Sequence, residues 1–137
     1  MQYWMLKSEP SAYSWDRLVK DGRTSWTGVR NHQAANNLKA MRQGDRGFFY
    51  HSNEGLAIVG VVEIVREAYP DPGDASGRFV TVDVAPVMPA KEPVTLAAIK
   101  ATKALAELAL VRQSRLSVSP VTPKEWRVLA KMAGIEA

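Results

Sequence analysis

The sequence predicts a single α+β domain, with strands in the middle of the chain and helices around them. The 137 residues are 46% hydrophobic and 23% charged, the size and balance of one globular unit with one core. Two neighbouring apolar segments, "FFYHS" and "LAIVGVVEIVREAY", are separated by the turn-forming "NEG", which is typical of paired strands. Segments with helical spacing and good cap residues flank them, and no internal repeat occurs.

The chain begins with a short strand and a short helix. "YWML", residues 3–6, is aromatic and apolar, and "KSEPS" stops it because proline lacks a donor and restricts the residue before it. Ser14 is a good cap for a brief helix that Asp21 and Gly22 end. Trp26 and Gly28 then lie in a connection.

A second helix follows that connection. Asn31 is a good cap, and Gly44 is a typical left-handed terminator. Between them, apolar residues recur at helical spacing at Ala34, Leu38 and Met41. We therefore expect a helix over residues 32–43.

The middle of the chain predicts two long strands, a loop and a third strand. Gly60 interrupts the second apolar run, so a bulge or a close backbone approach is expected there. "PDPGDASG", residues 70–77, is the most loop-like segment, and it is long enough to overhang a pocket. The alternating "FVTVDVAPV" after it predicts a half-buried strand.

The last third of the chain predicts short helices. Thr95 and Thr102 each precede apolar residues at helical spacing, and a polar stretch, "RQSRLSVSP", follows them. Thr122 as cap, Pro123 at the first helical position and Glu125 complete a capping box. This is the clearest local signal in the sequence, and Gly134 is expected to end that helix.

Composition excludes several classes of site. Without cysteine there is no disulfide, no thiolate nucleophile and no zinc site of the common cysteine kinds, and His32 and His51 lack partners at ligand spacing. A formal net charge of +4 favours a polyanionic partner without requiring one. No segment is apolar enough for a membrane span or a signal peptide, so we expect a cytoplasmic protein, or a nuclear one in a eukaryote.

The motifs of common enzymes are also missing. The chain has no G-x-S-x-G nucleophile elbow, no phosphate-binding loop and no dinucleotide fingerprint. What remains is a set of planar and polar side chains with arginines in loops, which suits a base held by stacking and edge hydrogen bonds. Binding is favoured over turnover; the alternatives are a small enzyme acting on a nucleotide with His51 and Glu9, and a protein-interaction module.

Several blocks in order resemble the EVE domain family. They are "YWMLKSEPSAYSWDRL", "WTGVRNHQAANNLKAMRQGD", "FFYHSN", "IVGVVEIVREAYPDP" and "LVRQSRLSVSPVTPKEW", which together span nearly the whole chain. The resemblance implies a PUA-like fold, a curved mixed β pseudo-barrel flanked by short helices and related to YTH and ASCH domains. It also implies recognition of modified bases, which YTH domains hold in an aromatic cage.

The YTH pattern can be carried over at several positions. Its Lys-Ser pair matches Lys7 and Ser8, and its following tryptophan matches Trp26. The next residue, commonly asparagine in YTH domains, is Glu9 here. A carboxylate only accepts hydrogen bonds, so Glu9 suits an exocyclic amine or a ring N–H and points away from the adenine readout, towards cytosine.

A second departure concerns the other wall of the cage. The loop that supplies another tryptophan in YTH domains is "PDPGDASGRF" here and contains none. Tyr69 or Phe79 could substitute for it, or the cage is one-sided.

The remaining candidates would hold the backbone of the nucleic acid. Arg115 lies near the position of a YTH arginine that contacts phosphate, and Arg30 with Asn31 begins the helix beside Trp26. Arginine offers a planar donor fork, and free N–H groups at a helix start favour an anion.

The sequence thus predicts a monomeric module that binds a modified base, methylated cytosine or adenine, in single-stranded or flipped-out DNA or RNA. No catalysis, cofactor or metal is expected. Each candidate also has a structural interpretation: Trp4 and Trp126 fit the core, His51 fits a satisfied strand histidine, and Asn31 fits a cap. The base-binding candidates are Trp26, Ser8, Glu9, Asn31, Tyr50, His51 and Ser52, and the phosphate-binding candidates are Lys7, Arg30 and Arg115.

Overall fold

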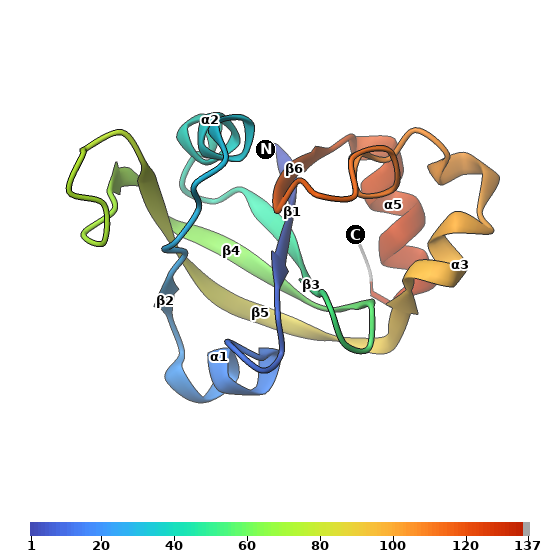
Figure 1. Cartoon of the computed structure of the whole chain (residues 1–137). Helices are drawn as coiled ribbons and strands as arrows, with labels where there is room; N and C mark the ends of the chain where they lie inside the picture. Colours follow the sequence, from blue (N-terminus) through green and yellow to red (C-terminus); the bar gives the residue numbers. More distant parts are fainter. Residues whose placement is uncertain (136–137) are drawn as a thin grey trace.

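A computed structural model of the chain describes residues 1–135, which form one six-stranded mixed sheet (Figure 1). The strand order is β2-β5-β4-β3-β1-β6, and the β1–β3 pair is parallel while the other pairs are antiparallel. The α+β class is confirmed, and the sheet is not closed, because β2 and β6 are its two edges. The strands are β1 (Tyr3–Ser8), β2 (Thr24–Ser25), β3 (Arg46–His51), β4 (Ala57–Pro70), β5 (Val80–Thr95) and β6 (Val118–Val121).

Helices cover both faces of the sheet, and each face has its own apolar cluster. One cluster joins α1 (Trp15–Asp21) and α2 (His32–Ala40) to strand residues that include Leu6 and Phe49. The other joins the C-terminal helices to residues that include Met5 and Tyr50. In Figure 1, α3 and α5 lie together at the opposite end of the molecule from the loop between β4 and β5. The C-terminal helices are α3 (Leu96–Lys100), the 3₁₀ turn η1 (Lys103–Leu105), α4 (Ala109–Arg112) and α5 (Pro123–Met132).

The cap residues act as the sequence predicts. The Ser14 hydroxyl accepts from the Arg17 N–H, and the Asn31 side chain accepts from the Ala34 N–H. The capping box of α5 is complete, since Thr122 and Glu125 each accept from the other's backbone N–H. These local bonds satisfy backbone donors that the first turn of a helix leaves free.

Two helical predictions differ from the structure in detail. The second helix ends at Ala40 rather than near residue 43, because buried Met41 is already extended, with ψ of 142°. Gly44 instead has a φ of +94° in the turn before β3. The short helical segment predicted after Thr102 is present as a 3₁₀ turn, but Thr102 makes no cap bond, and its hydroxyl donates to the Ala98 carbonyl instead.

Strands differ from the predictions at both sheet edges. The polar stretch after residue 111 leads into β6, an edge strand that pairs with β1. Nothing in the local sequence predicts this pairing. The two-residue β2 was not predicted, and β5 runs on to Thr95, well past the alternating segment. The pairing of an edge strand depends on its neighbouring strand rather than on local propensity, so it cannot be predicted from the local sequence.

Gly60 has both properties predicted for it. The pairing of β4 with β3 and with β5 shifts next to Gly60. A Cβ atom on Gly60 would also lie within 2.4 Å of the Trp15 ring. The indole of α1 therefore packs directly on the sheet backbone.

No helix in the described part of the chain is long and apolar enough to cross a membrane.

Candidate functional site

Two hollows meet at the C-terminal end of β1. The first, which we call the Trp26 hollow, has a volume of about 600 Å³ and lies between the end of β1, α1 and the connection that follows β2. Its size is that of a small-molecule site. Its lining comprises Lys7, Ser8, Glu9, Ala12, Tyr13, Arg17, Thr24, Ser25, Trp26, Thr27 and Gly28.

The second hollow, which we call the Tyr50 hollow, has a volume of about 460 Å³ and lies among β3, α3, α4 and the segment before β6. Lys7 and Glu9 belong to both hollows. The other lining residues are Tyr50, Ser52, Asn53, Leu56, Leu96, Leu110, Ser114, Arg115 and Ser117.

Strand alternation separates the two hollows. In the parallel β1–β3 pair, Lys7 is opposite Tyr50 and Ser8 is opposite His51. Successive side chains of a strand point to opposite faces, so Tyr50 lies on the Met5 face and His51 on the Leu6 face. The structure therefore does not place residues 50–52 together as one floor beneath Trp26; Tyr50 and Ser52 line the other hollow.

Trp26 is both a core residue and a wall residue. Its side chain is only 8% exposed and meets the Phe49 ring edge-on, with 5.6 Å between ring centroids. Its backbone N–H donates to the Val82 carbonyl at 2.7 Å. A small part of the indole thus borders the Trp26 hollow, while the rest is fixed by packing.

Tyr13 lines the Trp26 hollow, although the sequence did not predict it. It is half-buried, its hydroxyl donates to Asp21 at 2.8 Å, and the Arg17 guanidinium lies 5.2 Å from its ring centre. Burial contributes most to raising the pKa of Tyr13. Tyr69 and Phe79, the aromatic residues that the sequence suggested for a second wall, do not line this hollow. The position of Tyr13, five residues after Ser8, does not by itself mark it as a lining residue.

A buried carboxylate, Asp83, anchors β2 at one end of the Trp26 segment. It accepts hydrogen bonds from the hydroxyls of Ser25 and Tyr69, and it forms an ion pair with Arg23 at 3.0 Å. Burial alone would raise the pKa of Asp83, but the bonds from Tyr69, Arg23 and Ser25 lower it overall. Asp83 therefore stays ionised and holds the residue just before Trp26.

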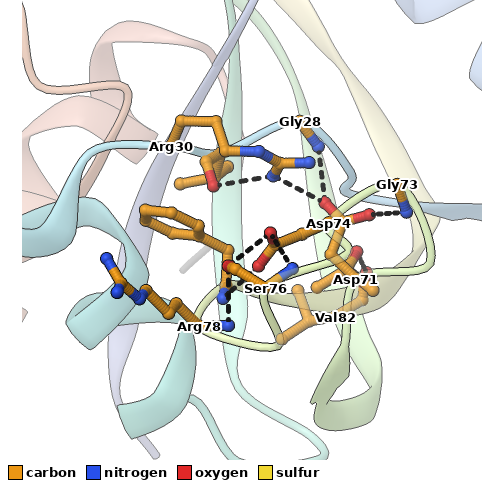
Figure 2. A network of polar contacts seen from close by, with 11 residues as sticks. Gly28, Arg30, Asp71, Gly73, Asp74, Ser76, Arg78 and Val82 are labelled. Atoms are coloured by element: carbon orange, nitrogen blue, oxygen red, sulfur yellow. Dashed lines mark hydrogen bonds and ion pairs between the residues drawn. The ribbon is translucent and has the colours of Figure 1, made fainter.

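A second buried carboxylate, Asp71, anchors the other end (Figure 2). It accepts from the Gly28 N–H at 2.9 Å, from the Arg30 guanidinium at 3.0 Å and from the Gly73 N–H at 2.8 Å. Burial opposes ionisation, but these three donors lower the pKa of Asp71. Gly28 has a φ of +84°, so its N–H is turned towards the carboxylate by a conformation that glycine permits.

The loop after Asp71 closes on itself. The Ser76 hydroxyl and the Phe79 N–H donate to Asp74 and lower its pKa to about 2. Phe79 in turn packs against His32 and against the Arg30 guanidinium. This loop does not line either hollow. It supports the connection that carries Trp26 through the bonds that Asp71 accepts from Gly28 and Arg30.

The Lys7–Glu9 segment forms the ridge between the hollows. The Lys7 ammonium donates to the Ser114 carbonyl at 2.7 Å, and burial lowers its pKa. The Ser8 hydroxyl donates to the Tyr13 carbonyl at 2.6 Å and keeps its lone pairs free to accept. Glu9 is exposed, so its carboxylate is accessible from both sides.

The predicted phosphate contacts do not all lie together. Arg115 is exposed and lines the Tyr50 hollow with Lys7. Arg30 lies apart, in its ion pair with Asp71, and Asn31 uses its side-chain oxygen to cap α2. Neither Arg30 nor Asn31 borders the Trp26 hollow.

His51 serves as an acceptor for α1. Its Nε2 atom accepts from the Trp15 N–H at 3.1 Å, and desolvation outweighs the nearby Asp16 charge to lower its pKa. His51 lines neither hollow, so the structure does not bring it beside Glu9 in one cavity. In residues 1–135 no group of three or more histidine and acidic side chains is placed to hold a metal ion.

Comparison with known proteins gives one family. A family model described as the EVE domain matches residues 2–132. Thymocyte nuclear protein 1 of chicken (Gallus gallus) is 38% identical over 158 residues, which cover 90% of this chain and 65% of that protein's length.

Solved structures agree with that match. The NMR structure of Rpa0253 from Rhodopseudomonas palustris is 59% identical, with a TM-score of 0.93 over 98% of this chain and 94% of that one. The human THYN1 protein, crystallised in complex with DNA containing 5-methylcytosine, is 31% identical, with a TM-score of 0.92 over 100% of both chains. A YTH domain from Zygosaccharomyces rouxii, at 16% identity and a TM-score of 0.62 over 96% of this chain and 86% of that one, shares the fold.

Proposed function

Because this chain belongs to the EVE domain family, we propose that it binds nucleic acid through a modified base that enters the Trp26 hollow. The observation that carries the proposal is the hollow itself, which has an indole and a phenol in its lining and polar groups at its rim. The human THYN1 structure with methylated DNA, similar over its full length, supports the same class of ligand. A base can enter such a cavity only after leaving its stack, so single strands and flipped-out nucleotides are the expected substrates.

Two aromatic residues would hold the base. Trp26 is fixed by Phe49 and by the anchored segments on either side of it, so it loses little freedom on binding. Tyr13 is the second aromatic residue of the hollow, and we assign it the wall that the β4–β5 loop supplies in YTH domains. Stacking on such rings contributes about 1 to 3 kcal/mol per base.

Polar edges of the base would meet the ridge. Ser8 offers hydroxyl lone pairs, and Glu9 offers a carboxylate that accepts from an exocyclic amine. The N4 amine of cytosine is such a donor, and Glu commonly accepts from it. Adenine also carries an exocyclic amine, so the choice of methylated cytosine rests in addition on the similar human THYN1 structure, whose DNA contains 5-methylcytosine. Lys7 and Arg115 would hold phosphate, whereas Arg30 acts by fixing the Trp26 segment.

The test is a titration of labelled single strands that carry 5-methylcytosine, cytosine, N6-methyladenine or adenine at one position. We expect the strand with 5-methylcytosine to bind most tightly at fixed salt. Equal binding to all four strands, with a strong salt dependence, would leave only charge attraction and contradict the proposal.

Glu9→Gln sharpens that test. The amide replaces one carboxylate oxygen with a donor, so preference for the cytosine strands over the adenine strands should fall about tenfold, the discrimination of one good base contact. Overall affinity need not fall, because a negative charge near phosphate is also removed. Glu92→Gln, an exposed glutamate of β5 that lines neither hollow, is the matched control and should keep the preference.

A further inference from the structure

We infer that the Tyr50 hollow receives the nucleotide next to the modified base in the same strand. This inference rests on the proposed function and deepens it. The Trp26 hollow would take the modified base, and the Tyr50 hollow would take its unmodified neighbour.

The two hollows adjoin at one short ridge. Lys7 and Glu9 line both, and β1 ends between them. The pairing of Lys7 with Tyr50 and of Ser8 with His51 puts the hollows on opposite faces of the sheet. A strand that lies over residues 7–9 could therefore direct one base to each face.

The lining of the Tyr50 hollow suits an unmodified nucleotide. Tyr50, Leu96 and Leu110 give it an apolar interior, with Leu56 exposed at its side. Ser52, Asn53 and Ser117 add groups that both donate and accept hydrogen bonds. Such a surface accepts the face of any base and can bond to varied edges, so it fits a neighbour of relaxed sequence.

Two cations lie where the linking phosphate would run. The Lys7 ammonium uses one of its three hydrogens for the Ser114 carbonyl and keeps two for a ligand. Arg115 is exposed, and within residues 1–135 it forms no ion pair. Because Lys7 lies on the ridge and is partly desolvated, a phosphate between the two nucleotides would meet a poorly screened charge there.

The first experiment removes the neighbouring base and leaves the protein unchanged. Three strands with one 5-methylcytosine are compared: an intact strand, one with an abasic site on the 5′ side, and one with an abasic site on the 3′ side. We expect one of the two abasic strands to bind at least fivefold more weakly than the intact one, the lower limit for losing a stacked base.

The second experiment alters the hollow. Leu56 is 42% exposed, so Leu56→Glu should fold while placing a charge against the base. Val19→Glu is the matched control, since Val19 is a 53% exposed residue of α1 that lines neither hollow. Leu56→Glu should weaken binding of the intact strand at least fivefold relative to Val19→Glu. It should not add to the loss caused by the abasic site, and it should leave binding of free 5-methyldeoxycytidine unchanged.

The outcomes separate the two proposals. If both abasic strands bind like the intact strand, or if Leu56→Glu matches Val19→Glu, the neighbour subsite is wrong while preference for the modified base persists. If the wild-type protein shows no preference for the modified base in any strand, the proposed function fails, and this inference fails with it.

Discussion

The walls of the two hollows are held in place by different physics. The segment that carries Trp26 is a two-residue strand and a connection, fixed at both ends by hydrogen bonds to the buried carboxylates Asp83 and Asp71. Tyr50 lies in β3, an interior strand of the sheet, and belongs to an apolar cluster that continues into the C-terminal helices. One wall therefore depends on ionised groups and the other on apolar burial.

The difference between the two walls indicates which of them must be held in one exact position. A short edge strand with few partners of its own would be mobile, and directional bonds to fixed charges hold it in one geometry. A neighbour subsite that accepts any base needs no such precision, and an apolar surface is enough for it. The comparison predicts that charge-removing changes act on the Trp26 side and spare the Tyr50 side.

The largest effect is expected from Trp26→Ala. Removal of a buried indole should lower the free energy of unfolding by about 3 to 5 kcal/mol. Loss of the stacked base should also weaken binding of the modified strand by roughly one to two orders of magnitude. Denaturant unfolding and fluorescence anisotropy measure the two effects.

Trp15→Ala is the control that separates stability from binding. Trp15 is also buried and also meets Phe49 with centroids 5.6 Å apart, but it lines neither hollow. It should cost a similar amount of stability and leave the affinity of the folded protein within about twofold. Equal losses of affinity in both variants would mean that Trp26 acts only through the core.

Asp71→Ala should have the next largest effect. It removes the buried carboxylate that accepts from the Gly28 N–H and pairs with Arg30, and we expect a loss of about 2 to 3 kcal/mol, less than a fully buried ion pair costs, because the Arg30 side chain is 41% exposed and can be hydrated. The released Trp26 segment would have to be ordered again on binding. This entropic cost, about 1.4 kcal/mol, should lower affinity for the modified strand about tenfold.

Glu107→Ala is the matched surface change. Glu107 pairs with Arg112 at 3.7 Å, and its side chain is 81% exposed, so its removal should change stability by less than about 1 kcal/mol. If Asp71→Ala cost no more than Glu107→Ala, the carboxylate would not be anchoring the Trp26 segment.

Lowering the pH should produce the smallest and most gradual loss of folding stability. The pKa values of Asp71 and Asp83 are lowered in the folded protein, so the folded state binds fewer protons than the unfolded state near those values. Their stabilisation is fully present above the unfolded pKa of about 4 and is lost as pH falls through the folded values. Unfolding curves from pH 6 to pH 2 should show this loss, and Asp71→Asn should make it shallower. An identical slope in Asp71→Asn would contradict the assignment.

Much of the fold could be predicted because its signals are local. The caps at Ser14, Asn31 and Thr122 act within three residues, and the bulge at Gly60 follows from a missing side chain. The edge strands β2 and β6 could not be predicted, because their partners β5 and β1 lie far away in the sequence.

The candidate site was predictable only in part. Lys7, Ser8, Glu9 and Trp26 could be placed by resemblance, and the structure brings all four to the Trp26 hollow. Their contacts with a base stay predictions. Tyr13 was missed because nothing in its local sequence distinguishes a lining tyrosine from a packed one, and the division of residues 50–52 between two faces required the register of β1 with β3.

The sequence by itself determined the α+β class, the starts of α1, α2, α3 and α5, and the family, because capping, alternation and motif order are properties of neighbouring residues. Only the tertiary structure decided that Asp71 and Asp83 are anchors rather than surface acids, and that one ridge separates two cavities. The reason is physical: a carboxylate becomes a structural group when distant donors surround it, and a cavity exists only where segments far apart in the chain fail to fill the space between them.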